Sequence, residues 1–175
     1  MMIRNFFWAL GPNVSHYPGA YPNGFLERCK SEGFWGMRRL HLCSGTVADG
    51  VTIDCKRELR PSILADLEIG IPCKDETFDA IFIDPPYSEE HAAGLYGVHL
   101  LSVPRLLTES ARVVRRNGFV CLLSWSVWTT WSAKKNAMEL YALGAVYTAN
   151  RGVKPLRALS VWKKRPHPLE HYDED

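Results

Sequence analysis

Short apolar runs alternate with longer amphipathic stretches along most of the chain. Seven of the runs predict β-strands, because most of them are continuous blocks of apolar residues. They cover residues 39–44, 51–55, 62–66, 78–84, 119–125, 144–149 and 157–164. Strands of this kind are typical of a sheet that is covered on both faces.

The stretches between these runs carry helix signals. The clearest covers residues 102–118, where Ser102 can cap the helix, Pro104 suits its first turn and Gly118 can end it. Weaker patterns predict helices over residues 23–32, 89–97 and 133–142. This order predicts an α/β fold with an open, mostly parallel sheet and helices on both faces, and the last two strands predict an antiparallel hairpin at one edge.

The length of 175 residues predicts a single domain covering residues 1–175. The apolar runs are far shorter than the roughly 20 residues of a membrane helix, and no signal-peptide pattern is evident, so we expect a cytoplasmic protein. The five cysteines form no CxxC pair and the six histidines no HxxxH or HExxH pattern. Reduced thiols and no metal site are therefore expected.

Charge is distributed unevenly along the chain. The formal net charge is +2, but four acids crowd residues 166–175, and without them 21 basic residues face 15 acidic ones, a charge of +6. We expect residues 166–175 to form a disordered acidic tail. A basic body suits a polyanionic partner, although a solvated, soluble surface explains the same charge.

Four consecutive predicted strands end in residues that can bind a ligand, namely Gly45, Asp54, Asp66 and Asp84. Open α/β sheets bind their ligands beyond the carboxyl ends of the strands. A glycine lets backbone N–H groups approach a ligand, an acid at the next strand end can accept both ribose hydroxyls, and a further acid can accept from the adenine amino group. The set predicts a site for an adenosine-bearing cofactor.

This arrangement resembles the class I S-adenosylmethionine-dependent methyltransferases, which have a Rossmann-like fold. The resemblance implies S-adenosyl-L-methionine as cofactor and Asp54 as the acid that binds the ribose. It also makes residues 1–35 a segment that closes over the methionine end of the cofactor; a loop that only covers a sheet edge is the alternative. The other cofactor-binding residues that it implies are Gly19, Tyr21, Pro22, Cys43, Ser44, Gly45, Asp66 and Leu67.

The link between the first two strands of this pattern departs from the family. Only eight residues separate Gly45 from Asp54, whereas a crossover helix with its loops needs at least a dozen. The first crossover helix should therefore be missing or reduced to one turn, with a tight turn at Asp49 and Gly50. So short a link favours antiparallel pairing or a strand swap, in which case Asp54 would not be the ribose acid.

The corner Asp84, Pro85, Pro86 and Tyr87 reads DPPY, which resembles the catalytic motif of methyltransferases that modify exocyclic nitrogens of nucleic-acid bases. In that role Asp84 and the carbonyl of Pro85 accept the two amine hydrogens and aim the nitrogen lone pair at the methyl group. The prolines hold the carbonyl in place, and Tyr87 offers a face for a flipped base. An ordinary Asp-Pro turn is the structural alternative.

DPPY is typical of enzymes that methylate adenine N6 in DNA, so DNA is the expected substrate. Some ribosomal RNA methyltransferases acting on guanine N2 or adenine N6, and an inactive binding protein with the same fold, are the alternatives. The chain has no room for a target-recognition region, which suggests a homodimer or an accessory specificity subunit. We expect Trp125 beside the core and Trp128 exposed. Substrate contacts are expected at Ser88, Trp128, Arg115, Arg116, Lys154 and Arg157, the basic ones on phosphates unless they are merely solvated.

Overall fold

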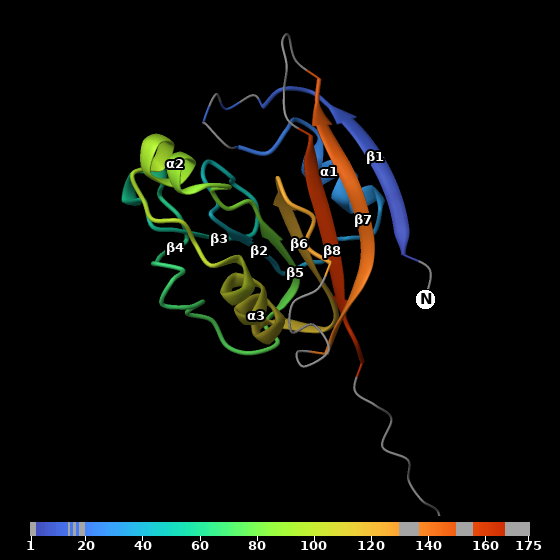
Figure 1. Cartoon of the computed structure of the whole chain (residues 1–175). Helices are drawn as coiled ribbons and strands as arrows, with labels where there is room; N and C mark the ends of the chain where they lie inside the picture. Colours follow the sequence, from blue (N-terminus) through green and yellow to red (C-terminus); the bar gives the residue numbers. More distant parts are fainter. Residues whose placement is uncertain are drawn as a thin grey trace, which may run out of the picture.

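A mixed sheet forms the centre of the molecule (Figure 1). The computed structural model describes residues 3–13, 15, 17, 20–129, 137–149 and 156–166. Within these residues the sheet has eight strands in the order β1-β7-β8-β6-β5-β2-β3-β4. Their bounds are β1 Arg4–Leu10, β2 Arg39–Leu42, β3 Val51–Asp54, β4 Ile63–Leu64, β5 Phe78–Ile83, β6 Val114–Ser124, β7 Met138–Thr148 and β8 Arg157–Lys164.

Helices cover both faces of this sheet, as the sequence predicts. Figure 1 shows α3 (Val103–Val113) in front of the sheet and α1 (Phe25–Ser31) on its far side. Adjacent residues of β5 point to opposite faces, so that Ile81 packs in the cluster that contains α3 and Phe82 in the one that contains α1. Three short turns of helix, η1 (Arg57–Leu59), α2 (Glu89–His91) and η2 (Ala92–Tyr96), lie in the connections.

Strand β8 runs antiparallel to both of its neighbours, β6 and β7, while the other strand pairs are parallel in the described part of the chain. The predicted antiparallel hairpin of β7 and β8 is confirmed. It does not form the edge, because β1 pairs in parallel with the other side of β7. The ring of Phe6 occupies the space beside Gly144, where a Cβ atom would lie 1.9 Å from it.

The link between β2 and β3 contains no helix, which confirms the prediction of a missing crossover helix. The expected antiparallel pairing is wrong, because the two strands pair in parallel with Leu40 opposite Val51. An extended residue spans about 3.3 Å, so the link of eight residues is long enough to return along the four residues of β2. The crossover therefore needs no helix.

Two ionic hydrogen bonds hold the end of this link against the start of β2. Arg39 donates from Nε and Nη2 to the two carboxylate oxygens of Asp49, at 2.7 Å each. Gly50 follows with φ +61°, and a Cβ atom there would lie 2.7 Å from the carbonyl oxygen of Arg39. The predicted turn at Asp49 and Gly50 thus depends on a residue without a side chain.

One predicted helix end and one predicted helix are wrong. Helix α3 ends at Val113 and β6 begins at the next residue, so Gly118 lies inside a strand, where a Cβ atom would be 2.7 Å from the carbonyl oxygen of Asp79. The helix expected over 133–142 is contradicted at Met138–Ala142, which belong to β7; residues 133–136 lie outside the described residues. Pairing with β8 from Met138 onward, and with β1 from Ala142 onward, fixes this segment as a strand.

No helix in the described part of the chain is long and apolar enough to cross a lipid bilayer. The five cysteines are free thiols. Among the described residues, no group of three or more His, Cys, Asp or Glu side chains is arranged to hold a metal ion. The expected acidic tail lies outside the described residues, apart from its first position.

Candidate functional site

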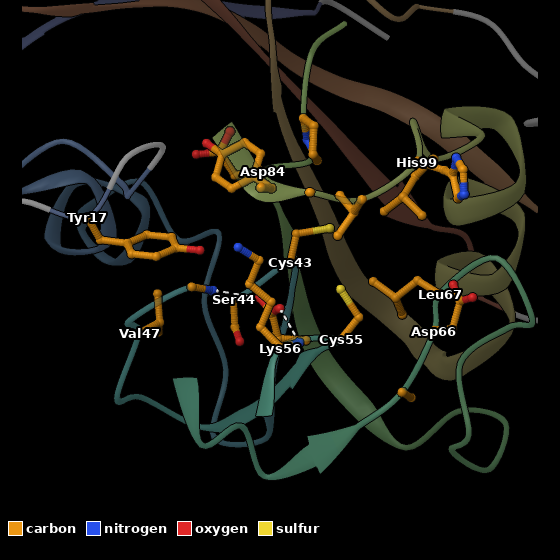
Figure 2. A pocket seen from close by; sticks show the side chains of 18 of the residues that line it. Tyr17, Cys43, Ser44, Val47, Cys55, Lys56, Asp66, Leu67, Asp84 and His99 are labelled. Carbon is orange, nitrogen blue, oxygen red and sulfur yellow. Dashed lines mark hydrogen bonds between the residues drawn. The ribbon is translucent and has the colours of Figure 1, made fainter. Parts of the chain in front are cut away.

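A cavity of about 410 Å³ lies at the carboxyl ends of β2, β3, β4 and β5 (Figure 2). The order of the sheet reverses between β2 and β5, since the chain proceeds outward to β4 and then returns to the other side of β2. Such a switch point is where open α/β sheets bind ligands. The sequence-predicted residues on its wall are Tyr21, Cys43, Ser44, Gly45, Asp54, Asp66, Leu67, Asp84 and Pro86.

Asp54 joins the ends of β2 and β3 at the cavity. One carboxylate oxygen accepts a hydrogen bond from the backbone N–H of Gly45 at 3.0 Å, and the other accepts from the N–H of Lys56 at 3.0 Å. The residue is 8% exposed. The short link therefore leaves Asp54 on the cavity wall, where each oxygen retains a lone pair for a ligand.

The N-terminal segment covers the loop that follows β2. Gly45 has φ +53°, and a Cβ atom there would lie 3.1 Å from the ring of Tyr17, so the loop and the tyrosine are in close contact. Tyr17, Ala20 and Tyr21 line the cavity. Pro22 is buried but does not line it, and Gly19 lies outside the described residues. Residues 4–10, which belong to the same predicted closing segment, form strand β1.

Three polar atoms on the cavity wall have no hydrogen-bond partner among the described residues. They are the hydroxyl of Tyr21, Oγ of Ser44 and Oδ2 of Asp84. Buried polar atoms in folded proteins are nearly always paired, because an unpaired one costs about 1–3 kcal/mol. A polar ligand in the cavity would satisfy these atoms, so they indicate a binding site.

Asp84 follows β5 and is buried at the corner of the cavity, opposite Asp66 in Figure 2. Its side chain is 5% exposed, and its Oδ2 atom lies 3.5 Å from Nη1 of Arg157. The hydroxyl of Tyr87 donates a hydrogen bond to Oδ1. Burial raises the pKa of Asp84 to about 7, although Arg157 and Tyr87 act to lower it. The carboxyl group therefore changes its protonation state near neutral pH.

The other residues of the corner have separate environments. Pro85 is buried, and Pro86 lines the cavity. The ring of Tyr87 packs against Trp125 with their centroids 5.1 Å apart. Ser88 caps helix α2, because its Oγ accepts a hydrogen bond from the backbone N–H of His91. This contact gives Ser88 a structural role.

The two tryptophans after β6 are placed opposite to the prediction. Trp125 is 44% exposed, with its ring edge-on to His91 at 4.5 Å. Trp128 is partly buried against the cluster that contains α3, and its backbone N–H donates to Oγ of Ser160. The strand ends at Ser124, one residue before Trp125, so the side chain of Trp125 leaves the sheet. The expectation of a core Trp125 and an exposed Trp128 is wrong.

The basic residues predicted to contact phosphates do not gather in one place. Arg115 pairs with Asp79 at 2.6 Å and Arg116 with Glu76 at 3.1 Å, both at the amino end of β5, away from the cavity. Only Arg157 lies at the Asp84 corner. Lys154 lies outside the described residues.

Sequence reasoning missed part of the cavity wall. Tyr96 comes from η2, its ring centroid lies 6.4 Å from that of Tyr17, and the ammonium group of Lys56 lies 5.7 Å from the centre of its ring. Burial raises the pKa of the Tyr96 hydroxyl to about 12. Tyr96 belongs to the segment after the DPPY corner that the sequence places beside the base pocket, so the residue that was missed is Lys56. Its place two residues after Asp54 does not predict a contact across the site.

The strand order and the position of the cavity define the fold as Rossmann-like and methyltransferase-type. A chain in the complex between the Haloferax volcanii Trm112 methyltransferase activator and the putative methyltransferase matches at 11% identity and a TM-score of 0.54, over 76% of this chain and 84% of that one. A SAM-dependent methyltransferase from Methanosarcina mazei matches at 12% identity and a TM-score of 0.50, over 78% and 97%. No protein-family model and no curated protein matches the sequence.

Proposed function

We propose that this chain is an S-adenosyl-L-methionine-dependent methyltransferase that acts on an exocyclic amino nitrogen of a nucleic-acid base, with adenine N6 in DNA as its substrate. One observation carries the proposal. The acids Asp54, Asp66 and Asp84, from three different strand ends, line a single cavity together with the hydroxyl of Tyr21 and Oγ of Ser44, which have no hydrogen-bond partner among the described residues.

The residues of the cavity fit this cofactor. Its volume falls in the range of about 300–1,000 Å³ that is usual for small-ligand sites. Asp54 has lone pairs left for the two ribose hydroxyls, and Asp66 with Leu67 lies beyond it for the adenine. The cofactor supplies a methyl group on a positively charged sulfur. The rings of Tyr17, Tyr21 and Tyr96 offer faces that attract such a charge.

Asp84 can act as an acceptor for the substrate amine. Its Oδ1 is occupied by the hydroxyl of Tyr87, whereas Oδ2 has no hydrogen-bond partner among the described residues. An amine hydrogen donated to Oδ2, with the second hydrogen on the carbonyl of Pro85, orients the nitrogen lone pair toward the methyl group. The rigid prolines keep the two acceptors at a fixed separation.

The exposed tryptophan suggests how the base is held. Trp125 contacts Tyr87, which in turn contacts Asp84, so an aromatic surface leads from the catalytic corner outward. Stacking of a base on an aromatic side chain contributes about 1–3 kcal/mol. Trp125 thus replaces Trp128 as the proposed stacking residue. Phosphate contacts by Arg115, Arg116 and Lys154, and a homodimer or accessory specificity subunit, remain further proposals.

Transfer of labelled methyl groups tests the proposal. Purified protein is incubated with tritiated S-adenosylmethionine and duplex DNA, single-stranded DNA or ribosomal RNA, and the modified nucleoside is identified by mass analysis. N6-methyladenine in DNA is expected. Label in guanine N2 or adenine N6 of RNA would instead support the RNA alternative. Cofactor binding without transfer to any of them would support an inactive binding protein.

A further inference from the structure

Arg157 lies at the first position of β8, and its side chain is directed into the protein. Its side chain is 11% exposed, and its guanidinium group makes three polar contacts. Nη1 lies 3.5 Å from Oδ2 of Asp84 and donates to the hydroxyl of Tyr87 at 3.3 Å, while Nη2 donates to Oγ1 of Thr148 at 3.3 Å. These contacts leave little of the group available for a phosphate in solvent.

The antiparallel direction of β8 explains this position. The start of β8 lies beside the end of β6, with Ala158 opposite Ser124. The carboxyl ends of the parallel strands and the amino end of β8 therefore meet at the same edge of the sheet. An arginine at the start of β8 reaches the corner that follows β5, although 72 residues separate it from Asp84 in the sequence.

We infer that Arg157 is a positioning residue of the catalytic corner, which keeps the Asp84 carboxylate ionised and oriented and holds the hydroxyl of Tyr87 between them. The effect of this positioning on the rate of catalysis rests on the proposed methyl transfer. The hydroxyl accepts from Arg157 and donates to Oδ1 of Asp84, so its proton has a fixed direction. The arrangement leaves Oδ2 as the acceptor that faces the substrate.

The charge of Arg157 opposes the effect of burial on Asp84. Burial favours the neutral acid, and a nearby guanidinium group favours the carboxylate. Four other titratable groups among the described residues interact electrostatically with Asp84. Burial raises the pKa of each of them, so all four are neutral around pH 7. These groups are Tyr21, Cys43, Tyr87 and Tyr96. Among the described residues, Arg157 is therefore the cation that opposes the larger effect of burial on the protonation of Asp84.

The test is a pH titration of the Asp84 carboxyl in the full chain without cofactor, with the carboxyl signal observed by carbon-13 NMR. The signal is assigned by its absence from the spectrum of Asp84→Asn. In Arg157→Gln the midpoint should rise by about one unit or more, so that the ionised fraction at pH 7 falls from about half to about one tenth. In Arg157→Lys, which keeps the charge, the rise should be smaller. Arg38→Gln is the matched control, because Arg38 contacts Asp79 at the other end of β5 and should leave the midpoint unchanged.

Methyl transfer provides the second measurement. At pH 7 Arg157→Gln should lower the rate about fivefold, and the rate should recover toward that of the unchanged protein near pH 9. An unchanged Asp84 midpoint in a folded Arg157→Gln variant overturns the inference, even where methyl transfer is observed. A shifted midpoint in a protein that transfers no methyl group supports the positioning role and contradicts the proposed function.

If Arg157→Gln does not fold, a variant of Tyr87 tests the positioning role of Arg157. Tyr87→Phe removes the hydroxyl between the guanidinium group and the carboxylate and leaves both charges in place. The Asp84 midpoint should rise, because a hydrogen bond to the ionised form is lost. A midpoint equal to that of the unchanged protein would overturn the inference.

Discussion

The backbone N–H of Gly45 donates a hydrogen bond of 3.0 Å to the carboxylate of Asp54, across the ends of two parallel strands. Gly45 follows β2 and Asp54 ends β3, and these two strands are joined without a crossover helix. The contact holds the glycine loop and the predicted ribose acid at the same edge of the cavity. The short link therefore preserves the relation between loop and acid on which the proposed cofactor site depends.

Asp54→Asn should weaken binding of S-adenosylmethionine by about tenfold or more, since a charged acceptor for two hydroxyls is replaced by a neutral group with one acceptor oxygen. Equilibrium dialysis with labelled cofactor measures the change. Asp75→Asn is the matched control, because Asp75 pairs with Arg112 on the surface away from the cavity. Equal affinities of Asp54→Asn and the unchanged protein would show that Asp54 does not hold the ribose.

The rate of methyl transfer should rise with pH and level off above the pKa of Asp84, which is about 7 without cofactor, because only the ionised form of Asp84 fills both roles required of it as acceptor. Bound cofactor should move the midpoint down, since a positive charge favours the carboxylate. Rates measured between about pH 5 and 9 at saturating cofactor test this. A rate that is constant over that range would contradict the role of Asp84.

The same pKa predicts how stability depends on pH. The folded pKa of Asp84 is raised from 3.8 to about 7, so the folded state binds the proton more tightly than the unfolded state. Its stabilising contribution is fully present below the unfolded value and is lost as the pH rises through about 7. The free energy of unfolding of the unchanged protein minus that of Asp84→Asn should therefore fall between about pH 4 and pH 7. A difference that increases over this range would contradict the raised pKa.

Asp49→Ala should lower the free energy of unfolding by about 1–3 kcal/mol, because it removes both hydrogen bonds that hold the link to Arg39. Arg39 lowers the pKa of Asp49, so the contribution is present above the unfolded pKa and is lost as the pH falls through the folded one. Denaturation in urea at neutral and acidic pH measures both effects. A loss of stability that is larger at acidic pH would contradict this account.

Trp125→Ala should raise the KM for nucleic acid about tenfold and leave the affinity for S-adenosylmethionine unchanged, since Trp125 is exposed beside the corner and does not line the cavity. Trp128→Ala should mainly reduce stability, because its ring packs against the core. Measuring the rate of methyl transfer at varied DNA concentration distinguishes the effect of Trp125→Ala from that of Trp128→Ala. An unchanged KM in Trp125→Ala would remove it from the proposed base-binding surface.

The sequence predicts those parts of the fold that depend on local patterns. The strands Phe78–Ile83 and Arg157–Lys164 are found as predicted, because apolar residues dominate the centre of each segment. The missing crossover helix could be predicted from the length of the link between Gly45 and Asp54 alone. The antiparallel pairing inferred with it was wrong, since an extended link can return along a strand of only four residues when Arg39 holds its end.

Features that depend on distant contacts could not be predicted. Strand β1 is defined by pairing with β7, about 138 residues later in the sequence, and its own run resembles any short apolar segment. The contact between Arg157 and Asp84 depends on the direction of β8, which no local pattern specifies. The acids at the strand ends were found because the carboxyl ends of parallel strands meet at one edge.

Calorimetric titration of S-adenosylmethionine into the unchanged protein and into Asp84→Ala, with methyl transfer assayed on the same samples, tests the central claim most directly. The account predicts that both proteins bind the cofactor with similar affinity and that only the unchanged protein transfers the methyl group. No binding by the unchanged protein, or loss of binding in Asp84→Ala, would contradict it.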